Sequence, residues 1–201
     1  MAGEVVKSFA APGPDPTAIF FDGHNLWITS VQTGLVYHVT RNGKVLNSFV
    51  LGTGYIYGVT SDGKDFWIVD NYDAVLRKTN RKGYVIRACA VPDVQPISIT
   101  FDGMRLWHGD TNNDWIYMIS QDGVNLKRIR PQAGYAIGLD FDGKDLIRTE
   151  QVAQTIEVRN REKLLISSVV IEWDVLNGVA FDGQYFWICG EALDLIYQVR
   201  R

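Results

Sequence analysis

The sequence predicts an all-β fold, a closed five-bladed β-propeller with four antiparallel strands in each blade, formed by residues 1–201 as a single domain. Three observations lead to this prediction: a constant forty-residue repeat, the absence of helical periodicity, and the way in which the two chain ends fit the repeat. The repeat is marked by five Asp-Gly pairs, which are Asp22-Gly23, Asp62-Gly63, Asp102-Gly103, Asp142-Gly143 and Asp182-Gly183.

The first two predicted strands of each repeat flank the Asp-Gly pair. A short apolar run precedes it, as in residues 18–21, and a second β-prone run follows it, as in residues 26–28. Asp-Gly between two such runs is a strong hairpin signal, because glycine accepts the positive φ that a tight turn needs. Four of the five second runs carry a tryptophan at one position, which we expect to fill the wedge between neighbouring blades: Trp27, Trp67, Trp107 and Trp187.

The third and fourth strands complete each repeat. Residues 35–39 are an example of the third run, and a second turn, such as Asn42-Gly43, leads into a fourth run at residues 44–50. Four antiparallel strands in about forty residues have the size of a propeller blade, whereas leucine-rich and helical repeats have other lengths and patterns. One such unit cannot bury its own apolar faces, so the five must pack on one another.

The chain ends predict how the ring closes. Residues 3–9 align with residues 43–49, so they read as a fourth strand, while the C-terminus follows the third strand of the fifth repeat. We therefore expect the N-terminal strand to complete the last blade. Five repeats of forty residues account for nearly all of the 201 residues, which favours a closed ring over a fragment of a longer array.

Composition narrows the function classes. Apolar residues make up 46% of the chain and charged residues 21%, which excludes disorder and membrane spans. A net charge of −3 gives no positive field for nucleic acid or anionic lipid. Cys89 and Cys189 occupy different repeat positions and suggest neither a disulfide nor a zinc site. The N-terminus lacks the features of a secretory signal, so we expect a cytoplasmic monomer, or a secreted protein if a leader has been removed.

The repeats resemble those of YVTN-type and NHL-like short-repeat β-propeller proteins. The motifs that carry the resemblance are the Asp-Gly pair, a Leu-Trp pair such as Leu26-Trp27, a later Ile-Tyr pair such as Ile196-Tyr197, and the glycine turn. The resemblance covers nearly the whole chain and implies a fold but no activity, since such repeats occur in lyases, sensor domains and binding scaffolds. Plant-type glutaminyl cyclases are also similar in blade number, but no stretch here matches their catalytic segments.

A candidate binding face follows from the predicted topology. If the glycine turns lie on one face of the disc, the other loops surround the mouth of the central channel on the opposite face. Aromatic and acidic residues of these loops suit a sugar, a peptide or a cationic amine. The predicted ligand-binding residues are Tyr57, Asp70, Tyr72, Asp110, Trp115, Tyr135, Glu150 and Trp173.

The candidate residues are not equally informative. Asp70, Asp110 and Glu150 share one repeat position, which favours a role in capping their own loops. Tyr57 and Tyr135 do not recur in every repeat and are better indicators of a site. The fourth repeat departs from the pattern at Ile147, Glu157 and Lys163; we favour drift in a tolerant blade, with specialisation for function as the alternative.

Enzymatic and metal-binding interpretations have weaker support. We expect small or neutral residues to face the channel, with Asp140 as a lone carboxylate, whereas a glycosidase needs two. His24, His38 and His108 fall at three different repeat positions, which disfavours a histidine metal site. No cofactor is expected, although calcium could bind loop carboxylates, namely Asp70, Asp73, Asp110 or Asp114.

These observations predict a non-enzymatic binding or scaffold module for an unknown small molecule or protein, with neither nucleic acid nor membrane as a partner. The alternative is a hydrolase or lyase that acts on a small polar or sugar-like substrate at the channel mouth.

Overall fold

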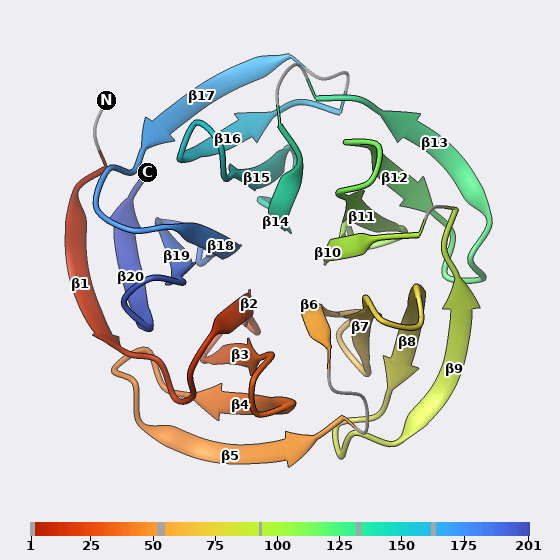
Figure 1. Cartoon of the computed structure of the whole chain (residues 1–201), viewed down its shortest axis with the longest axis horizontal. Coiled ribbons are helices and arrows are strands. Elements are labelled where there is room, and N and C mark those ends of the chain that lie inside the picture. Colours follow the sequence, from red (N-terminus) through yellow and green to blue (C-terminus); the bar gives the residue numbers. More distant parts are fainter. Residues whose placement is uncertain (1–2, 52–54, 93, 132–133, 162–163) are drawn as a thin grey trace.

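The computed structural model describes residues 3–51, 55–92, 94–131, 134–161 and 164–201. Their strands form five four-stranded antiparallel sheets arranged as blades around one axis, with the first strand of each blade innermost and the fourth at the rim (Figure 1). The predicted five-bladed propeller is therefore confirmed. Within the described residues, no helix has the length and apolar character needed to cross a lipid bilayer.

The strands follow one another in blade order. Blade A consists of β2 (Pro16–Phe21), β3 (Leu26–Ser30), β4 (Leu35–Val39) and β5 (Val45–Val50). Blade B consists of β6 (Ile56–Ser61), β7 (Phe66–Asp70), β8 (Val75–Thr79) and β9 (Val85–Ala90). Blade C consists of β10 (Pro96–Phe101), β11 (Leu106–Asp110), β12 (Ile116–Ile119) and β13 (Asn125–Ile129). Blade D consists of β14 (Ala136–Phe141), β15 (Leu146–Glu150), β16 (Thr155–Arg159) and β17 (Leu165–Val170). Blade E consists of β18 (Leu176–Phe181), β19 (Tyr185–Gly190), β20 (Leu195–Arg200) and β1 (Val5–Ala10).

Blade E closes the ring as predicted. The N-terminal strand β1 pairs antiparallel with β20, so the first and last strands of the chain lie side by side (Figure 1). Backbone bonds extend this pairing: the Arg200 amide donates to the Glu4 carbonyl over 3.0 Å, and the Gly3 amide donates to the Val170 carbonyl of blade D over 2.7 Å.

The hydrophobic core consists of five clusters, one in each wedge between neighbouring blades. Trp27 packs with Phe66 and Ile68 of blade B, and Trp187 packs with Ile19 and Ile28 of blade A. Trp67 and Trp107 fill the next wedges in the same way, as predicted. A buried side chain of this size contributes about 3 kcal/mol to folding, so the wedges account for much of the stability of the ring.

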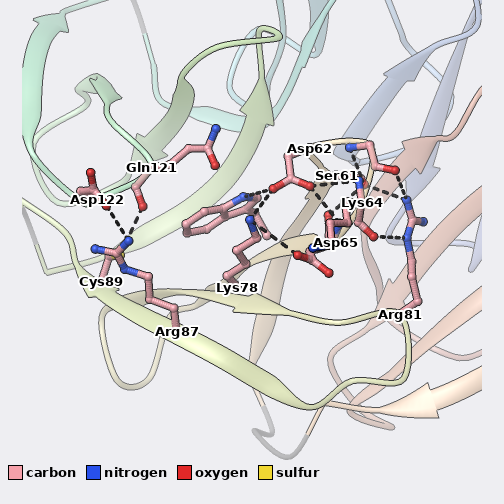
Figure 2. Close-up of polar contacts among 12 residues, drawn as sticks. Ser61, Asp62, Lys64, Asp65, Lys78, Arg81, Arg87, Cys89, Gln121 and Asp122 are labelled. Carbon is pink, nitrogen blue, oxygen red and sulfur yellow. Dashed lines mark hydrogen bonds and ion pairs between the residues drawn. The ribbon is translucent and has the colours of Figure 1, made fainter.

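The Asp-Gly turns hold these tryptophans in place. In the turn of blade A, one carboxylate oxygen of Asp22 accepts the amides of His24 and Asn25, and the other accepts the indole N–H of Trp27 over 2.8 Å. Figure 2 shows the equivalent turn of blade B, where Asp62 also pairs with Lys78 over 2.7 Å. The aspartate therefore serves the turn and the wedge together.

Arginines from the following blade reach three of these aspartates. The pairs are Arg161 with Asp102 at 3.6 Å, Arg201 with Asp142 at 2.7 Å and Arg41 with Asp182 at 3.7 Å. Blade C has Gln121 at the position of these arginines, which explains why Asp62 takes its cation, Lys78, from its own blade. Each of the three aspartate–arginine pairs links two adjacent blades on the face of the glycine turns.

Of the small residues that we expected to face the channel, Ala18, Gly58, Ser98, Gly138 and Gly178 line the void along its axis, whereas Asp140 does not. A Cβ added to Gly58 would meet Ile99 of blade C, and one added to Gly178 would meet Ala18 of blade A. Each sheet stands radially, so side chains of its inner strand leave sideways, toward the neighbouring blades. Small residues at these positions allow the inner strands to approach one another closely.

Candidate functional site

A pocket of about 270 Å³ opens at the channel mouth, on the face opposite the glycine turns. Four of its residues come from innermost strands, and the others come from the loops before β2, after β3 and after β19. The lining residues are Asp15, Thr17, Val31, Tyr57, Ile137, Asn177 and Glu191. Its size is close to the lower limit for small-molecule sites, so it suits a small ligand.

A β-bulge in each innermost strand places the lining residues. The pairing of β2 with β3 shifts between Pro16 and Ala18, which leaves Thr17 as the extra residue. The same shift occurs in β6 around Tyr57, in β14 around Ile137 and in β18 next to Asn177. A bulge re-aims one side chain out of the ladder, and here it presents that side chain to the mouth.

Hydrogen bonds between adjacent blades form a belt beneath the pocket. Each bond runs from a side chain of one blade to a backbone carbonyl at the start of the next inner strand. The five bonds are Thr17 to Ile56 (2.8 Å), Asn71 to Pro96 (2.8 Å), Ser98 to Ala136 (2.6 Å), Thr149 to Asn177 (2.5 Å) and Asn177 to Pro16 (3.1 Å). The belt satisfies buried carbonyls and fixes the bulged residues relative to one another.

The channel below the mouth is nearly closed. The void along the axis has a volume of only about 10 Å³, close to the room that one water molecule needs. Gly58, Gly138 and Gly178 are among the residues that line it. A ligand can therefore enter from the mouth face but cannot pass through the disc.

The ionisable groups of the pocket are Asp15, Tyr57 and Glu191. Asp15 and Tyr57 are half-buried, while Glu191 is exposed at the rim. Burial raises the pKa of the Tyr57 phenol above its usual value, and the negative charges of Glu191 and Asp15 raise it further. The phenol is therefore neutral at physiological pH, and it lies in a negative potential.

Among the predicted site residues, Tyr57 lies in this pocket, whereas the three predicted carboxylates are buried in their own loops. Asp70 accepts the Asp73 amide and binds Arg77, and Asp110 accepts the Gln95 and Asn112 amides. Glu150 accepts the Val152 and Ala153 amides. These bonds are those of the capping role that the shared repeat position favours.

The other predicted aromatic residues, Tyr72, Tyr135, Trp115 and Trp173, are not part of the pocket lining. Tyr72 is 79% exposed and stacks on Tyr55, with the ring centroids 5.7 Å apart. The Tyr135 hydroxyl donates to Gln151 over 2.8 Å. Trp115 lies beneath the Arg128 guanidinium at 4.5 Å, and Trp173 packs on Tyr197 at 4.1 Å.

The divergent residues of blade D form a buried ion cluster. Glu157 accepts the Arg148 guanidinium over 2.7 Å and the Arg159 guanidinium over 2.6 Å, and these arginines lower the pKa of the glutamate. Ile147 takes the tryptophan position in the wedge between blades D and E. These contacts show that blade D packs with core residues that differ from those of the other repeats. Lys163, the third divergent residue, lies outside the described residues.

Six lining residues were missing from the predicted set: Asp15, Thr17, Val31, Ile137, Asn177 and Glu191. A signal for them exists in the repeat alignment. Thr17, Tyr57, Ile137 and Asn177 share one repeat position, and Val31 shares another with Glu191. When residues of different chemistry occupy one repeat position, folding does not determine the residue type there, and the position is free to serve binding.

A second pocket, of about 260 Å³, lies on the opposite face and is lined by Asp102, Met104, Arg105, Met118 and Arg161. Its Asp102–Arg161 pair is one of the links between blades, so this pocket has a structural explanation. In the part of the chain that the structure describes, no three His, Cys, Asp or Glu side chains are grouped to hold a metal ion. In the calcium candidates, Arg77 binds Asp70 and Asp73, and Arg130 lies 3.7 Å from Asp114.

Comparison with known proteins supports the fold. No protein-family model and no curated protein sequence matches the chain. A glutaminyl cyclase from Myxococcus xanthus is similar in structure, with a TM-score of 0.83 over 99% of this chain and 96% of that one, at 12% identity. A virginiamycin B lyase from Staphylococcus aureus has a TM-score of 0.60 over 99% of this chain and 73% of the lyase, at 21% identity. A streptogramin B lyase has a TM-score of 0.59 over 94% of this chain and 66% of the lyase, at 18% identity. At these identities the similarity shows the propeller fold alone.

Proposed function

We propose that this protein is a non-enzymatic binding module that takes a small polar ligand in the pocket at the channel mouth. The observation that carries the proposal is the bulge repeated in the inner strands, which places side chains of different chemistry in the lining of one pocket. The belt of hydrogen bonds holds the Thr17 and Asn177 side chains before a ligand arrives, and such preorganisation lowers the entropic cost of binding.

The chemistry of the lining supports a ligand with both polar and apolar parts. Thr17 and Asn177 each use a polar group in the belt, while Val31 and Ile137 give apolar walls. Tyr57 adds an aromatic ring and a hydroxyl group. Pockets of this composition bind small molecules through apolar contact and fix their orientation through a few polar groups.

A thermal-shift series tests the proposal. The probes are glucose, glycylglycine, butylammonium chloride and calcium chloride, each titrated against the wild type, Tyr57→Ala and Tyr84→Ala. A ligand that binds only the folded state raises the melting temperature with concentration. We expect at least one probe to do so for the wild type, and Tyr57→Ala to abolish the shift.

Tyr84 provides the control, because it is exposed in the turn that precedes β9, on the opposite face. Tyr84→Ala should keep the wild-type response. A flat response to the three organic probes, or an organic-probe response that survives Tyr57→Ala, would contradict the proposed site. The calcium arm tests the loop carboxylates separately, since its response should then be independent of Tyr57.

The second candidate is a hydrolase or lyase at the same mouth. Its support is that Asp15, Tyr57 and Glu191 line one pocket and that similar folds occur in a cyclase and two lyases. The raised pKa of Tyr57 opposes its use as a base or nucleophile near neutral pH. NMR spectra of the organic probes after incubation separate the candidates: unchanged probe signals support binding, and product signals support the enzyme.

A further inference from the structure

The acidic residues of the mouth pocket lack a countercharge. No lysine or arginine in the described ranges forms an ion pair with the carboxylate of Asp15 or Glu191, and the described lining contains no basic residue. Elsewhere on the same face, the chain neutralises its acids: Arg77 pairs with Asp70 and Asp73, and Arg130 lies near Asp114. Asp15 and Glu191 therefore keep their negative charge without a paired cation, unlike Asp70, Asp73 and Asp114.

The surrounding loops reinforce this negative potential. Among the described loop residues of the mouth face, Arg130 is the basic residue, and the acidic ones are Asp15, Asp73, Asp114, Glu172, Asp174, Glu191 and Asp194. The opposite face balances its aspartates with residues such as Arg41, Arg161 and Arg201. A concave site ringed by one sign of charge concentrates ligands of the other sign.

The remaining lining fits an organic cation better than a bare metal ion. Tyr57 offers an aromatic ring, which attracts ammonium groups, and Val31 and Ile137 offer apolar contact for an alkyl chain. The negative charge that raises the pKa of Tyr57 is the same charge that a bound cation would neutralise. A hydrated divalent ion would gain nothing from the apolar walls.

We infer that the pocket binds a primary alkylammonium group, with the charge between Asp15, Tyr57 and Glu191 and the alkyl chain against Val31 and Ile137. This inference rests on the proposed function and adds the chemical class of the ligand. The group can belong to a free small amine or to a lysine side chain of a polypeptide, and the experiment separates these sources.

Isothermal titration calorimetry tests the inference with three probes: butylammonium, 1-butanol, and the peptide Gly-Gly-Lys-Gly-Gly blocked at both ends. We expect butylammonium to bind at least tenfold more tightly than butanol, and its affinity to fall as salt is raised. Glu191→Gln should weaken ammonium binding about tenfold. Glu172→Gln, which removes an exposed acid of the same face outside the pocket lining, should weaken it less than twofold, because that charge acts only through the long-range potential.

The outcomes distinguish the inference from the proposal beneath it. Equal affinity for butanol and butylammonium, or wild-type affinity in Glu191→Gln, would overturn the ammonium inference. Tyr57-dependent binding of glucose in that case would leave the binding module intact, whereas no Tyr57-dependent binding of any probe would overturn both. Tighter binding of the peptide than of butylammonium assigns the group to a polypeptide, and the reverse order assigns it to a free amine.

Discussion

Asp140 is a residue whose environment opposes its charge. Its carboxylate accepts the Phe181 amide of blade E over 2.6 Å and the Thr100 hydroxyl of blade C over 3.3 Å, so it connects three blades. Burial raises its pKa from 3.8 to about 7, and nearby Asp142 adds to the shift. The carboxyl group has a structural role near the axis, and it lies outside the mouth pocket.

The raised pKa predicts a pH-dependent stability. The folded state holds the Asp140 proton up to about pH 7 and the unfolded state loses it near pH 4, so this residue makes the free energy of unfolding fall as pH rises through that window. We expect Asp140→Asn to remove about 2 kcal/mol of this decline between pH 5 and pH 8, measured by urea denaturation. The lowered pKa of His38 acts in the opposite sense, and comparison with the variant cancels its effect. Equal pH profiles for the two proteins would refute the assignment.

Sequence reasoning works at the residue scale where a residue repeats. The Asp-Gly aspartates and the wedge tryptophans could be assigned because five or four copies share one environment. Asp140 could not, because its partners Thr100 and Phe181 lie about forty residues away on either side and depend on the packing of three blades. The role of a residue that does not repeat depends on tertiary neighbours, which the repeat pattern does not specify.

At the scale of the element, a loop of blade E supplies a carboxylate that the end of strand β19 lacks. Gly190 occupies the repeat position of Asp70, Asp110 and Glu150, and a Cβ there would lie 2.1 Å from an oxygen of Asp174. Asp174 accepts the Val175 and Ala192 amides, which correspond to the Gln95 and Asn112 amides bound by Asp110. The carboxylate is thus conserved in space although it comes from another segment.

This exchange predicts a coupled pair of substitutions. Gly190→Asp alone should cost about 3 kcal/mol, because it crowds Asp174 and adds a like charge. Asp174→Ala alone should cost about 2 kcal/mol, because it leaves the Tyr197 hydroxyl and two amides without an acceptor. We expect the double variant to regain most of the loss, as measured by chemical denaturation. Strictly additive losses would show that the two positions are independent.

The elements themselves could be predicted, but the bulges could not. Apolar runs and Asp-Gly turns indicate four strands in each repeat, yet the extra residue in each innermost strand is a matter of backbone pairing. The side-chain pattern does not encode that pairing, so nothing in it singles out Thr17 as a lining residue. The pocket therefore lies on the face for which a site was predicted, and Tyr57 is the one predicted residue among its described lining residues.

At the scale of the whole molecule, the constant period determines how the ring closes. In the repeat alignment Arg201 corresponds to Arg41 and Gly3 to Gly43, so residue 2 takes the place of Asn42. Pairing of β1 with β20 repeats the pairing of β5 with β4, including a register shift in each ladder. The first described residues lie beside the C-terminal end of β20, where the Arg200 amide donates to the Glu4 carbonyl (Figure 1). Within the described residues, the closing ladder therefore repeats the pairing that joins β4 and β5.

This equivalence predicts that the opening of the chain can be moved. A permutant that runs from residue 43 to 201 and continues directly through residues 2 to 42 restores an uninterrupted turn between β20 and β1 and opens the one between β4 and β5. Its blade A is then closed by two chain ends, as blade E is in the native order. We expect the same fold with an unfolding free energy within about 2 kcal/mol of the wild type, since one turn closure replaces another of equal length. Circular dichroism and urea denaturation measure both quantities.

A permutant opened between Ile28 and Thr29 is the control, because it interrupts the fully buried strand β3 and should unfold. Failure of the first permutant with a well-folded control would mean that blade E, and not the repeat, determines closure.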